Sequence, residues 1–357
     1  MGNMEIALYR KYRPQTFKEI KGQDHIISVL ENEAKTDKVS HAYLFSGSRG
    51  TGKTSIARIF AKSLGVSSED IYEIDAASNR GIDEIRAVRD AVHTYPYSSK
   101  YKIYIVDEVH MLTKEAWNAF LKTLEEPPDH VIFLMATTEP HKLPDTVISR
   151  CECFAFKKPA HQILVESILK IAKTEKYEIE KKSASLIATL ADGSFRDAFS
   201  ILQKAMHSHY GTTPTKASAS QSTKLSHTEI EKVLGAPKES LVLKILEGIA
   251  EQNIEKGIEA VRDASEENSD MQVFLKMILR ALRFVLLLRF SKETKNLVIN
   301  ETGEEEFEKL SALAKTAKNI NSKTLLAFLE ASSRQTYASI PELPIELAII
   351  DTAGKKE

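Results

Sequence analysis

Short, uninterrupted apolar runs separated by polar segments fill the first half of the chain. A strand that is covered on both faces is apolar throughout, so such runs predict buried strands of a parallel sheet. Amphipathic helical patterns lie between the runs. Strands alternating with helices predict an α/β domain whose sheet is covered on both faces. The predicted strands are residues 42–46, 71–74, 103–106 and 131–136, and the predicted helices are 54–64, 82–92 and 114–125.

The strand pattern stops after about residue 157, and helical periodicity continues almost to the C-terminus. One segment interrupts it: a Ser/Thr-rich stretch that offers little apolar surface and is typical of a linker. The pattern predicts an α/β domain at 1–157, a small helical domain at 158–210, a linker at 211–226 and a larger helical domain at 227–357.

Composition adds limits to this picture. The chain has 357 residues, enough for two or three domains, and its 42% hydrophobic and 28% charged residues are typical of a soluble globular protein. The formal net charge of −1 means that any nucleic-acid contact must use local basic patches. The N-terminus lacks the apolar core of a secretory signal, and Arg280, Arg283 and Arg289 interrupt the most apolar helix. We therefore expect a cytoplasmic protein without a membrane partner.

The two cysteines, Cys151 and Cys153, are one residue apart. A bond between them would be strained, and two thiols cannot complete a four-ligand zinc site. We expect two thiols on an inward-facing strand.

A phosphate-binding loop follows the first predicted strand. The segment from Gly47 to Thr54 fits the pattern G-x-x-x-x-G-K-[ST], and it lies between a strand and a helix as this motif requires. Its backbone N–H groups and the helix N-terminus would bind phosphates of ATP, Lys53 would reach the β- and γ-phosphates, and Thr54 would bind Mg²⁺. The residues expected to contact the nucleotide here are Gly47, Ser48, Arg49, Gly50, Thr51, Gly52, Lys53, Thr54 and Ser55.

Two carboxylates, Asp107 and Glu108, end the third predicted strand, at the sheet edge where the loop also lies. Alone, such a pair is as often a solvated turn. Beside a phosphate loop, we expect Asp107 to hold Mg²⁺, directly or through water, and Glu108 to polarise the attacking water. The pair therefore favours ATP hydrolysis over binding alone.

Beyond these motifs, the chain resembles the gamma/tau family, the AAA+ ATPase subunits of the bacterial DNA polymerase III clamp loader. The resemblance implies an AAA+ P-loop domain at 1–157, a helical lid at 158–210 and a helical collar for oligomerisation at 227–357. Six segments carry it: residues 12–24, 41–58, 73–86, 106–128, 136–151 and 193–198.

The resemblance also implies roles for residues outside the two motifs. Thr138 matches the sensor-1 position, which reads the γ-phosphate or the water. Arg150, in a Ser-Arg-Cys motif, matches the arginine finger supplied to the ATP of a neighbouring subunit, and Arg196 matches sensor 2. Arg13 and Pro14 match the segment that lines the adenine pocket. Without the resemblance, the arginines would be interpreted as surface ion-pair partners.

A further hypothesis concerns Ser78 and Asn79, which follow the second strand. Their polarity and position suggest that they hold Glu108 away from water until DNA binds.

The chain departs from the family pattern between residues 64 and 71, where members carry a cysteine-rich zinc insert and this chain has no cysteine. Zinc is therefore not expected. The chain also lacks a long C-terminal extension, which predicts the shorter, gamma-like form or a truncated chain.

The function implied is that of an ATP-hydrolysing motor in DNA replication. It would join copies of itself and delta- and delta-prime-like subunits in a pentameric spiral that loads the sliding clamp onto primer–template DNA. Nucleotide addition would belong to another subunit of the polymerase. Two alternatives stay open: a different AAA+ machine, such as a branch-migration motor or helicase loader that forms a homohexamer, and a non-hydrolysing interaction subunit.

Overall fold

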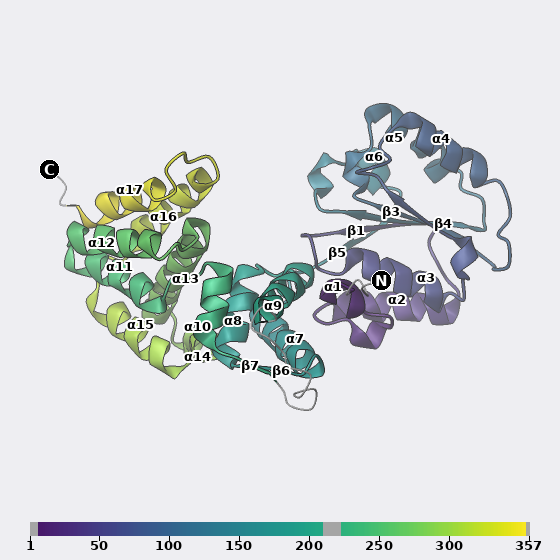
Figure 1. The fold of residues 1–357 in the computed structure, drawn as a ribbon. Coiled ribbons are helices and arrows are strands. Elements are labelled where there is room, and N and C mark those ends of the chain that lie inside the picture. The colour runs from purple at the N-terminus through teal and green to yellow at the C-terminus, as the bar shows by residue number, and fades with distance from the viewer. Residues whose placement is uncertain (1–5, 210–222, 355–357) are drawn as a thin grey trace. The chain divides into compact units, whose positions relative to one another are not determined.

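A computed structural model describes residues 6–209 and 223–354. The described chain divides into two compact units. The first comprises residues 1–163 with 193–197, and the second comprises 164–192 with 198–357. The positions of the chain's parts relative to one another are not determined (Figure 1), and each unit is described by itself.

The first unit is built around a parallel sheet whose strand order is β2-β3-β4-β1-β5. Its strands are β1 (Ala42–Ser46), β2 (Ile71–Asp75), β3 (Lys102–Asp107), β4 (Val131–Thr137) and β5 (Glu152–Ala155). Its helices are α1 (Leu8–Lys11), α2 (Asp24–Thr36), α3 (Lys53–Ser63), α4 (Ile82–Ala91), α5 (Lys114–Glu125) and α6 (Asp145–Ile148), with 3₁₀ turns η1 (Phe17–Glu19), η2 (Ser68–Asp70), η3 (Val109–Met111) and η4 (Pro140–Lys142).

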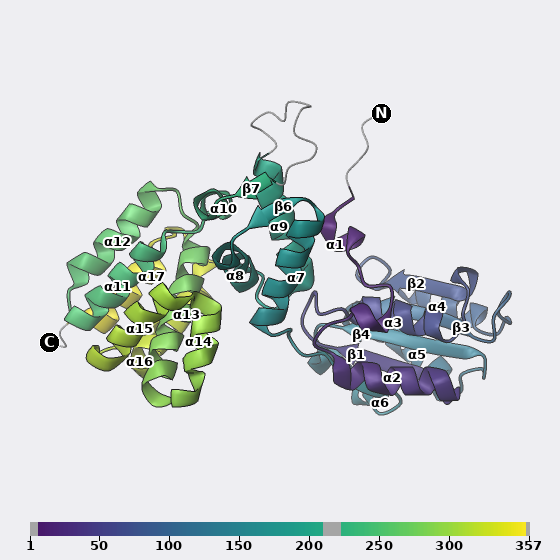
Figure 2. The same ribbon diagram turned by 90° about the horizontal axis from the view of Figure 1, so that it is seen from below.

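Helices cover both faces of this sheet, because alternate residues of each strand point to opposite sides. Tyr43 and Phe45 of β1 belong to the core under α2 and α3, whereas Leu44 belongs to the core under α4 and α5. Figures 1 and 2 show the two helical layers. The predicted α/β fold class is confirmed, and the structure adds the bounds of the edge strand β5.

Strand β5 corrects one expectation about the cysteines. Cys151 is partly buried just before the strand, and Cys153 is exposed within it. The side chain of Cys153 therefore does not point inward, because the short edge strand alternates partly buried and exposed residues.

The second unit is helical apart from one two-stranded parallel sheet, formed by β6 (Tyr177–Ile179) and β7 (Thr223–Leu225). Most of the predicted linker lies outside the described residues. Its last residues were predicted wrongly: 223–225 form β7, and Ser226 caps the next helix through a capping box with Glu229. The composition of this segment does not indicate a strand, because β7 gains its backbone hydrogen bonds from β6, which is distant in sequence.

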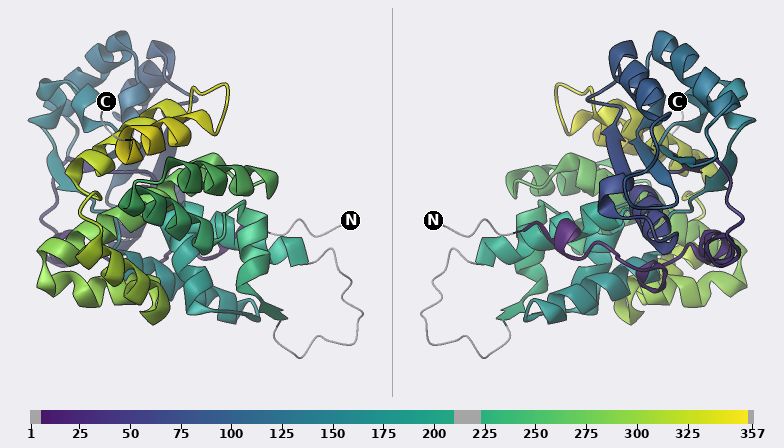
Figure 3. Two further views of the ribbon diagram at one scale, coloured as in Figure 1. Left: turned by 90° about the vertical axis from the view of Figure 1, so that its left-hand side faces the viewer. Right: turned by 90° about the vertical axis from the view of Figure 1, so that its right-hand side faces the viewer.

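Helix α7 (His161–Thr174) precedes β6, and α8 (Lys181–Leu190) and α9 (Phe195–His209) follow it. After β7 follow α10 (His227–Leu234), α11 (Glu239–Glu251), α12 (Ile254–Glu266), α13 (Met271–Phe290), η5 (Lys292–Thr294), α14 (Lys295–Thr302), α15 (Glu304–Thr316), α16 (Ser322–Gln335) and α17 (Leu343–Ala353). The bundle of α11–α17, green to yellow in Figure 3, encloses Phe274, Phe284 and Phe328, each fully buried. The predicted C-terminal helical region is confirmed.

Candidate nucleotide site

The loop after β1 turns sharply before it enters α3. Gly47 and Gly52 have φ values of 144° and 102°, a region that residues with a Cβ rarely adopt. A Cβ at Gly47 would also lie 2.7 Å from the carbonyl oxygen of Phe156. The loop leads directly into the N-terminus of α3, where the helix dipole favours an anion.

Lys53 is buried beside this loop, with 6% of the residue exposed. Its Nζ donates to the carbonyl oxygens of Gly47, at 2.8 Å, and Ser48, at 3.0 Å. An ammonium has three donors, so the third can reach a phosphate oxygen. Burial lowers the pKa of Lys53, and the negative charges of Glu108 and Asp107 raise it in part.

Three other residues expected to contact the nucleotide differ in burial and in their hydrogen bonds. Thr51 is buried, and its hydroxyl donates to the carbonyl oxygen of Ser48 over 2.9 Å, which closes the turn. Arg49 is exposed. Ser55, in the first turn of α3, accepts a 3.1 Å hydrogen bond from Nε of Arg13.

The carboxylate of Asp107 reaches the loop from the end of β3. Its Oδ2 accepts a hydrogen bond from the hydroxyl of Thr54 over 2.8 Å. Neighbouring ligands on an octahedral Mg²⁺ with bonds of 2.0–2.1 Å are about 2.9 Å apart, and Mg²⁺ prefers oxygen ligands. The donor set therefore fits this ion. Among the described residues no cluster of three or more His, Cys, Asp or Glu side chains has the arrangement of a metal site.

Glu108 follows Asp107 directly, and its contacts come from residues at the ends of β3 and β4. Its backbone has φ 49°, unusual for a residue other than glycine, and its N–H donates to Oδ1 of Asp107 over 3.0 Å. The hydroxyl of Thr138 donates to Oε2 of Glu108 over 3.0 Å. Thr138 follows β4, which lies between β1 and β3, so the sheet order brings this hydroxyl to the acid pair.

The hypothesis about Ser78 and Asn79 does not fit this geometry. The Ser78 hydroxyl donates to the carboxylate of Asp75, and the Asn79 amide donates to the Asp75 backbone carbonyl. These bonds close a turn after β2, whereas Glu108 is held by Thr138.

Sequence reasoning missed three polar residues beside Glu108: His110, Thr137 and Glu139. His110 bonds to Thr137 over 3.0 Å and lies 3.5 Å from Glu108. A usable signal was present, because these residues lie at or just after the carboxyl ends of adjacent strands, as Asp107 and Thr138 do.

Arg196 joins the first unit through the segment Gly193–Asp197. The backbone N–H of Phe195 donates to the carbonyl oxygen of Gly50 over 3.1 Å, so this segment contacts the phosphate loop directly. The guanidinium of Arg196 lies over the ring of Tyr9 in α1, 5.0 Å from its centroid.

Arg13 lies in the same neighbourhood. Its pKa is lowered first by burial and then by the positive charge of Arg58, while Asp107 raises it and Arg196 lowers it further. Pro14 is partly buried beside it.

Arg150 is the site residue that the structure does not bring to the loop. It lies two residues before Glu152, which is paired with Tyr43 of β1, whereas Gly47 lies four residues beyond Tyr43. At about 3.3 Å per residue, those four residues alone span about 13 Å of strand. Its guanidinium donates to the carboxylate of Glu125 over 2.7 Å.

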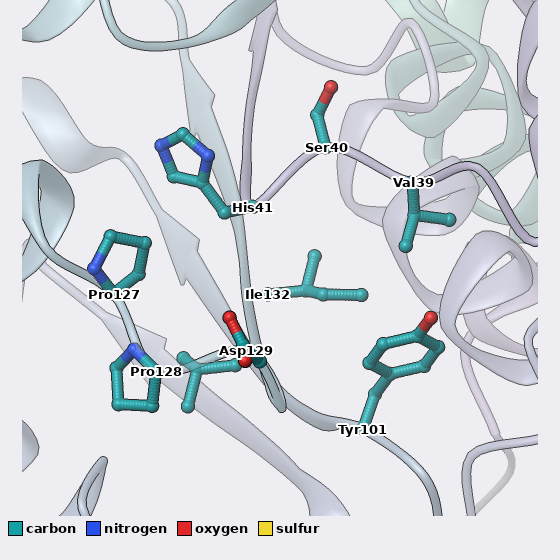
Figure 4. A pocket seen from close by; sticks show the side chains of 9 residues that line it. Val39, Ser40, His41, Tyr101, Pro127, Pro128, Asp129 and Ile132 are labelled. Atoms are coloured by element: carbon teal, nitrogen blue, oxygen red, sulfur yellow. The ribbon is translucent and has the colours of Figure 1, made fainter.

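A surface pocket of about 290 Å³ also lies away from the loop. Figure 4 shows His41, Pro128 and Tyr101 around it. His41 precedes β1 and Tyr101 precedes β3, so the pocket lies at the amino edge of the parallel sheet. It is separate from the cluster of Lys53, Asp107 and Glu108.

The parallel sheet, its phosphate loop and its helical lid and C-terminal region define the chain as a P-loop protein of the AAA+ class. The Holliday junction branch-migration motor RuvB of Thermotoga maritima shares the fold, with a TM-score of 0.51 and 21% identity over 67% of this chain and 80% of that one. By sequence, the chain belongs to the gamma/tau subunit family of DNA polymerase III.

Relatives and family models both carry this assignment. The chain is 33% identical to the gamma subunit of Buchnera aphidicola subsp. Schizaphis graminum over 85% of this chain and 86% of that protein. It is 39% identical to the tau subunit of Bacillus subtilis and 35% identical to that of Escherichia coli, over 85% and 80% of this chain. It covers 56% and 46% of those two proteins, about half their length.

Three family models match in chain order. The model described as DNA polymerase III, delta subunit matches residues 22–79 and 66–160. The clamp loader subunit ATPase lid domain matches 163–210, and domain III of the gamma and tau subunits matches 225–354.

Within the described residues, the helices are too short or too polar for any to cross a membrane.

Proposed function

We propose that the chain is an ATP-hydrolysing motor subunit of a replicative clamp loader. The observation that carries the proposal is the meeting of Thr54 and Asp107 beside the Lys53 ammonium, with Glu108 at the next position. Phosphoryl transfer needs this combination: a phosphate cradle, an oxygen site for a metal ion and a carboxylate that orients water.

In this proposal each residue has one task. The loop from Gly47 to Thr54 and the N-terminus of α3 bind the phosphates of ATP. Thr54 and Asp107 hold Mg²⁺, which neutralises charge on the phosphate oxygens when bound. Glu108 accepts a proton of the attacking water, and Thr138, which donates to Glu108, keeps the carboxylate turned toward the loop.

Arg150 serves a neighbouring subunit. Its strand register separates it from the loop of its own chain, so it cannot complete that site. A guanidinium on the opposite sheet edge can reach the ATP of an adjacent copy and neutralise the transferring phosphoryl group. In the free chain the hydrogen bond to Glu125 orients the Arg150 side chain, and Arg150 exchanges it for the neighbouring ATP on assembly.

Arg196, Arg13 and Pro14 complete the nucleotide contacts in this proposal. Arg196 acts as sensor 2 from the segment that contacts Gly50. Arg13, bonded to Ser55 of α3, and Pro14 line the adenine side. The proposed domains are those inferred from the sequence, 1–157, 158–210 and 227–357.

Partners follow from the family and from one surface. On α16 and α17 the side chains of Leu326, Leu329, Leu343, Leu347 and Ile350 are 42–58% exposed. Apolar side chains repeated along two packed helices mark an interaction surface, and we assign it to assembly with further copies and delta- and delta-prime-like subunits in a pentameric spiral. The assembly, in the cytoplasm, would load a sliding clamp onto primer–template DNA.

ATP turnover by the full chain, assembled with its clamp-loader partners, tests the proposal. We expect slow hydrolysis that rises when sliding clamp and primed DNA are both added. Glu108→Gln should abolish the rise and keep ATP binding, and Lys53→Ala should lose both. Wild-type assemblies that bind ATP and never hydrolyse it would instead identify a non-hydrolysing subunit, and a native mass of six identical chains would identify a different AAA+ machine.

A further inference from the structure

His110 is a buried polar side chain that the proposed function does not yet use. It lies in η3, three residues after Asp107, and its side chain is only 5% exposed. Three oxygen-bearing side chains face its ring. Nδ1 lies 3.0 Å from Oγ1 of Thr137 and 3.5 Å from Oε2 of Glu108, and Nε2 lies 3.2 Å from Oε2 of Glu139.

The groups at its two nitrogens orient the imidazole ring. The carboxylate of Glu139 only accepts, so Nε2 carries the hydrogen and donates it to Glu139. The hydroxyl of Thr137 accepts from the backbone N–H of Glu139 over 3.0 Å. The contacts at both ring nitrogens fix the plane of the imidazole.

Glu139 carries a negative charge beside the ring. A hydrogen bond from Lys142 lowers the pKa of Glu139 below its ordinary value, and the charge of Lys142 lowers it further, although burial opposes them. Glu139 therefore stays ionised at neutral pH and keeps accepting from Nε2.

The oriented ring bounds one side of the Glu108 carboxylate. Thr138 holds Oε2 of Glu108 from one direction at 3.0 Å, and Nδ1 of His110 lies 3.5 Å from the same oxygen. The carboxylate is thereby limited to a direction away from the ring.

We propose that His110, oriented by Glu139, is a positioning residue that sets the direction of the Glu108 carboxylate for activation of water. The inference rests on the proposed ATPase function. It assigns no substrate contact to His110, whose effect passes through Glu108.

The test measures single-turnover ATP hydrolysis and ATP affinity in clamp-loader assemblies with sliding clamp and primed DNA. We expect His110→Ala to slow hydrolysis by about 10- to 100-fold, the cost of a misdirected catalytic group. The affinity for ATP should change less than about twofold, because no binding contact is lost. His110→Asn, which can still bond Thr137, should recover part of the rate.

A double-variant comparison separates positioning from general damage. In a Glu108→Gln background, His110→Ala should add little further loss, since its target is gone. An equal loss in both backgrounds would overturn the inference, as would a loss of ATP affinity. Thermal unfolding of each variant identifies any failure to fold.

The orienting bond has its own matched pair of variants. Glu139→Gln keeps an acceptor for Nε2 and should retain most of the rate, whereas Glu139→Ala should slow hydrolysis in the direction of His110→Ala. Equal rates for the two variants would contradict the role of Glu139. If wild-type assemblies hydrolyse ATP but His110→Ala is unaffected, this inference alone fails; if wild-type assemblies are inactive, the proposed function fails.

Discussion

The hydroxyl of Thr54 donates a hydrogen bond to Oδ2 of Asp107 over 2.8 Å, and 53 residues of chain separate the two. Thr54 is the second residue of α3, and Asp107 ends β3. Their meeting depends on the sheet order, in which β4 lies between β1 and β3 and aligns the carboxyl ends of all three strands. A change at either residue therefore tests one and the same site.

Thr54→Ala and Asp107→Asn should each weaken Mg²⁺-dependent ATP binding. Thr54→Ala removes an oxygen ligand and Asp107→Asn replaces a charged carboxylate with a neutral amide, and each should cost at least the 10- to 100-fold typical of losing an outer-shell partner. Titration of a fluorescent ATP analogue with and without Mg²⁺ measures the effect. Thr54→Ser keeps the hydroxyl and is the control. Binding by Asp107→Asn that still depends fully on Mg²⁺ would refute the assignment.

Sequence predicted this part of the molecule well because its signals are local. The run Ala42–Ser46 and the glycine pattern after it are dictated by neighbouring residues, and the structure has β1 at those residues. Strand β5 was expected only as the strand that carries the cysteines and was given no bounds, because its four residues alternate partly buried and exposed positions and have no long apolar run. Strand β7 was missed because its partner β6 lies more than 40 residues earlier.

The candidate site divides in the same way. Lys53, Thr54 and Asp107 belong to contiguous motifs and could be found from sequence. The bonds of His110 to Thr137 and Glu139 join two strands, so they require the order of the sheet. The contact of Phe195 with Gly50 joins segments about 145 residues apart, and no local pattern indicates it.

Arg150→Ala should spare ATP binding by the chain and slow hydrolysis in the assembly by about 10³-fold or more, the typical contribution of an arginine finger. The reason is geometric, because Arg150 lies on the sheet edge opposite the loop of its own chain. Glu125→Ala removes the carboxylate partner of Arg150, leaves its hydrogen bond to the carbonyl oxygen of Thr146, and is the matched control. Mixing Arg150→Ala chains with Lys53→Ala chains tests action between subunits, since each supplies what the other lacks. Mixtures no more active than either variant would argue against a shared site.

Gly50→Ala should weaken the link between the loop and the segment Gly193–Asp197. A Cβ at Gly50 would lie 1.9 Å from Oγ of Ser194, and the φ of 74° adds a backbone cost of about 1–2 kcal/mol. We expect ATP to bind more weakly, because Arg196 is displaced with the segment. ATP affinity in Gly50→Ala, Arg196→Ala and the double variant measures this.

Ser194→Gly supplies the rescue, since it removes the two side-chain atoms that the new Cβ would meet. The variant Gly50→Ala with Ser194→Gly should bind ATP more tightly than Gly50→Ala alone. If the second change brings no recovery, the loss arises within the loop and not at its contact with Ser194.

Leu347→Glu combined with Ile350→Glu should weaken assembly without unfolding the chain. Both side chains are almost half exposed on α17, so the free chain loses little packing. Burying an apolar side chain in an interface contributes about 1.5–3 kcal/mol, so each change should raise the dissociation constant by about tenfold or more. Sedimentation velocity over a concentration series gives the result. Leu297→Glu, at an exposed position of α14, is the control and should leave assembly intact.

Stability of the C-terminal unit should fall as pH rises, because of Glu306 in α15. Burial raises the pKa of Glu306 from 4.5 to about 7; Glu239 supports the shift, while Arg280, Lys182 and Lys309 oppose it. Between these pH values the folded chain keeps a proton that the unfolded chain has lost, so the free energy of unfolding decreases as pH rises through that window and levels off above it.

At 1.36 kcal/mol per pKa unit, the shift corresponds to at most about 3 kcal/mol, and partial exposure of the side chain reduces this to about 1–2 kcal/mol. Glu306→Gln stays neutral, so it should be more stable than the wild type at pH 8 and nearly equal at pH 4.5. Urea unfolding, followed by the circular dichroism of the helices from pH 4.5 to 8, measures the free energy of unfolding of both proteins. The contributions of all groups that the two proteins share cancel in the difference. Glu305→Gln is the matched control, because a hydrogen bond from Lys309 lowers the pKa of Glu305 and reverses the sign of any slope. A difference between Glu306→Gln and wild type that is flat across this range would show that the Glu306 carboxyl is solvated in the folded chain.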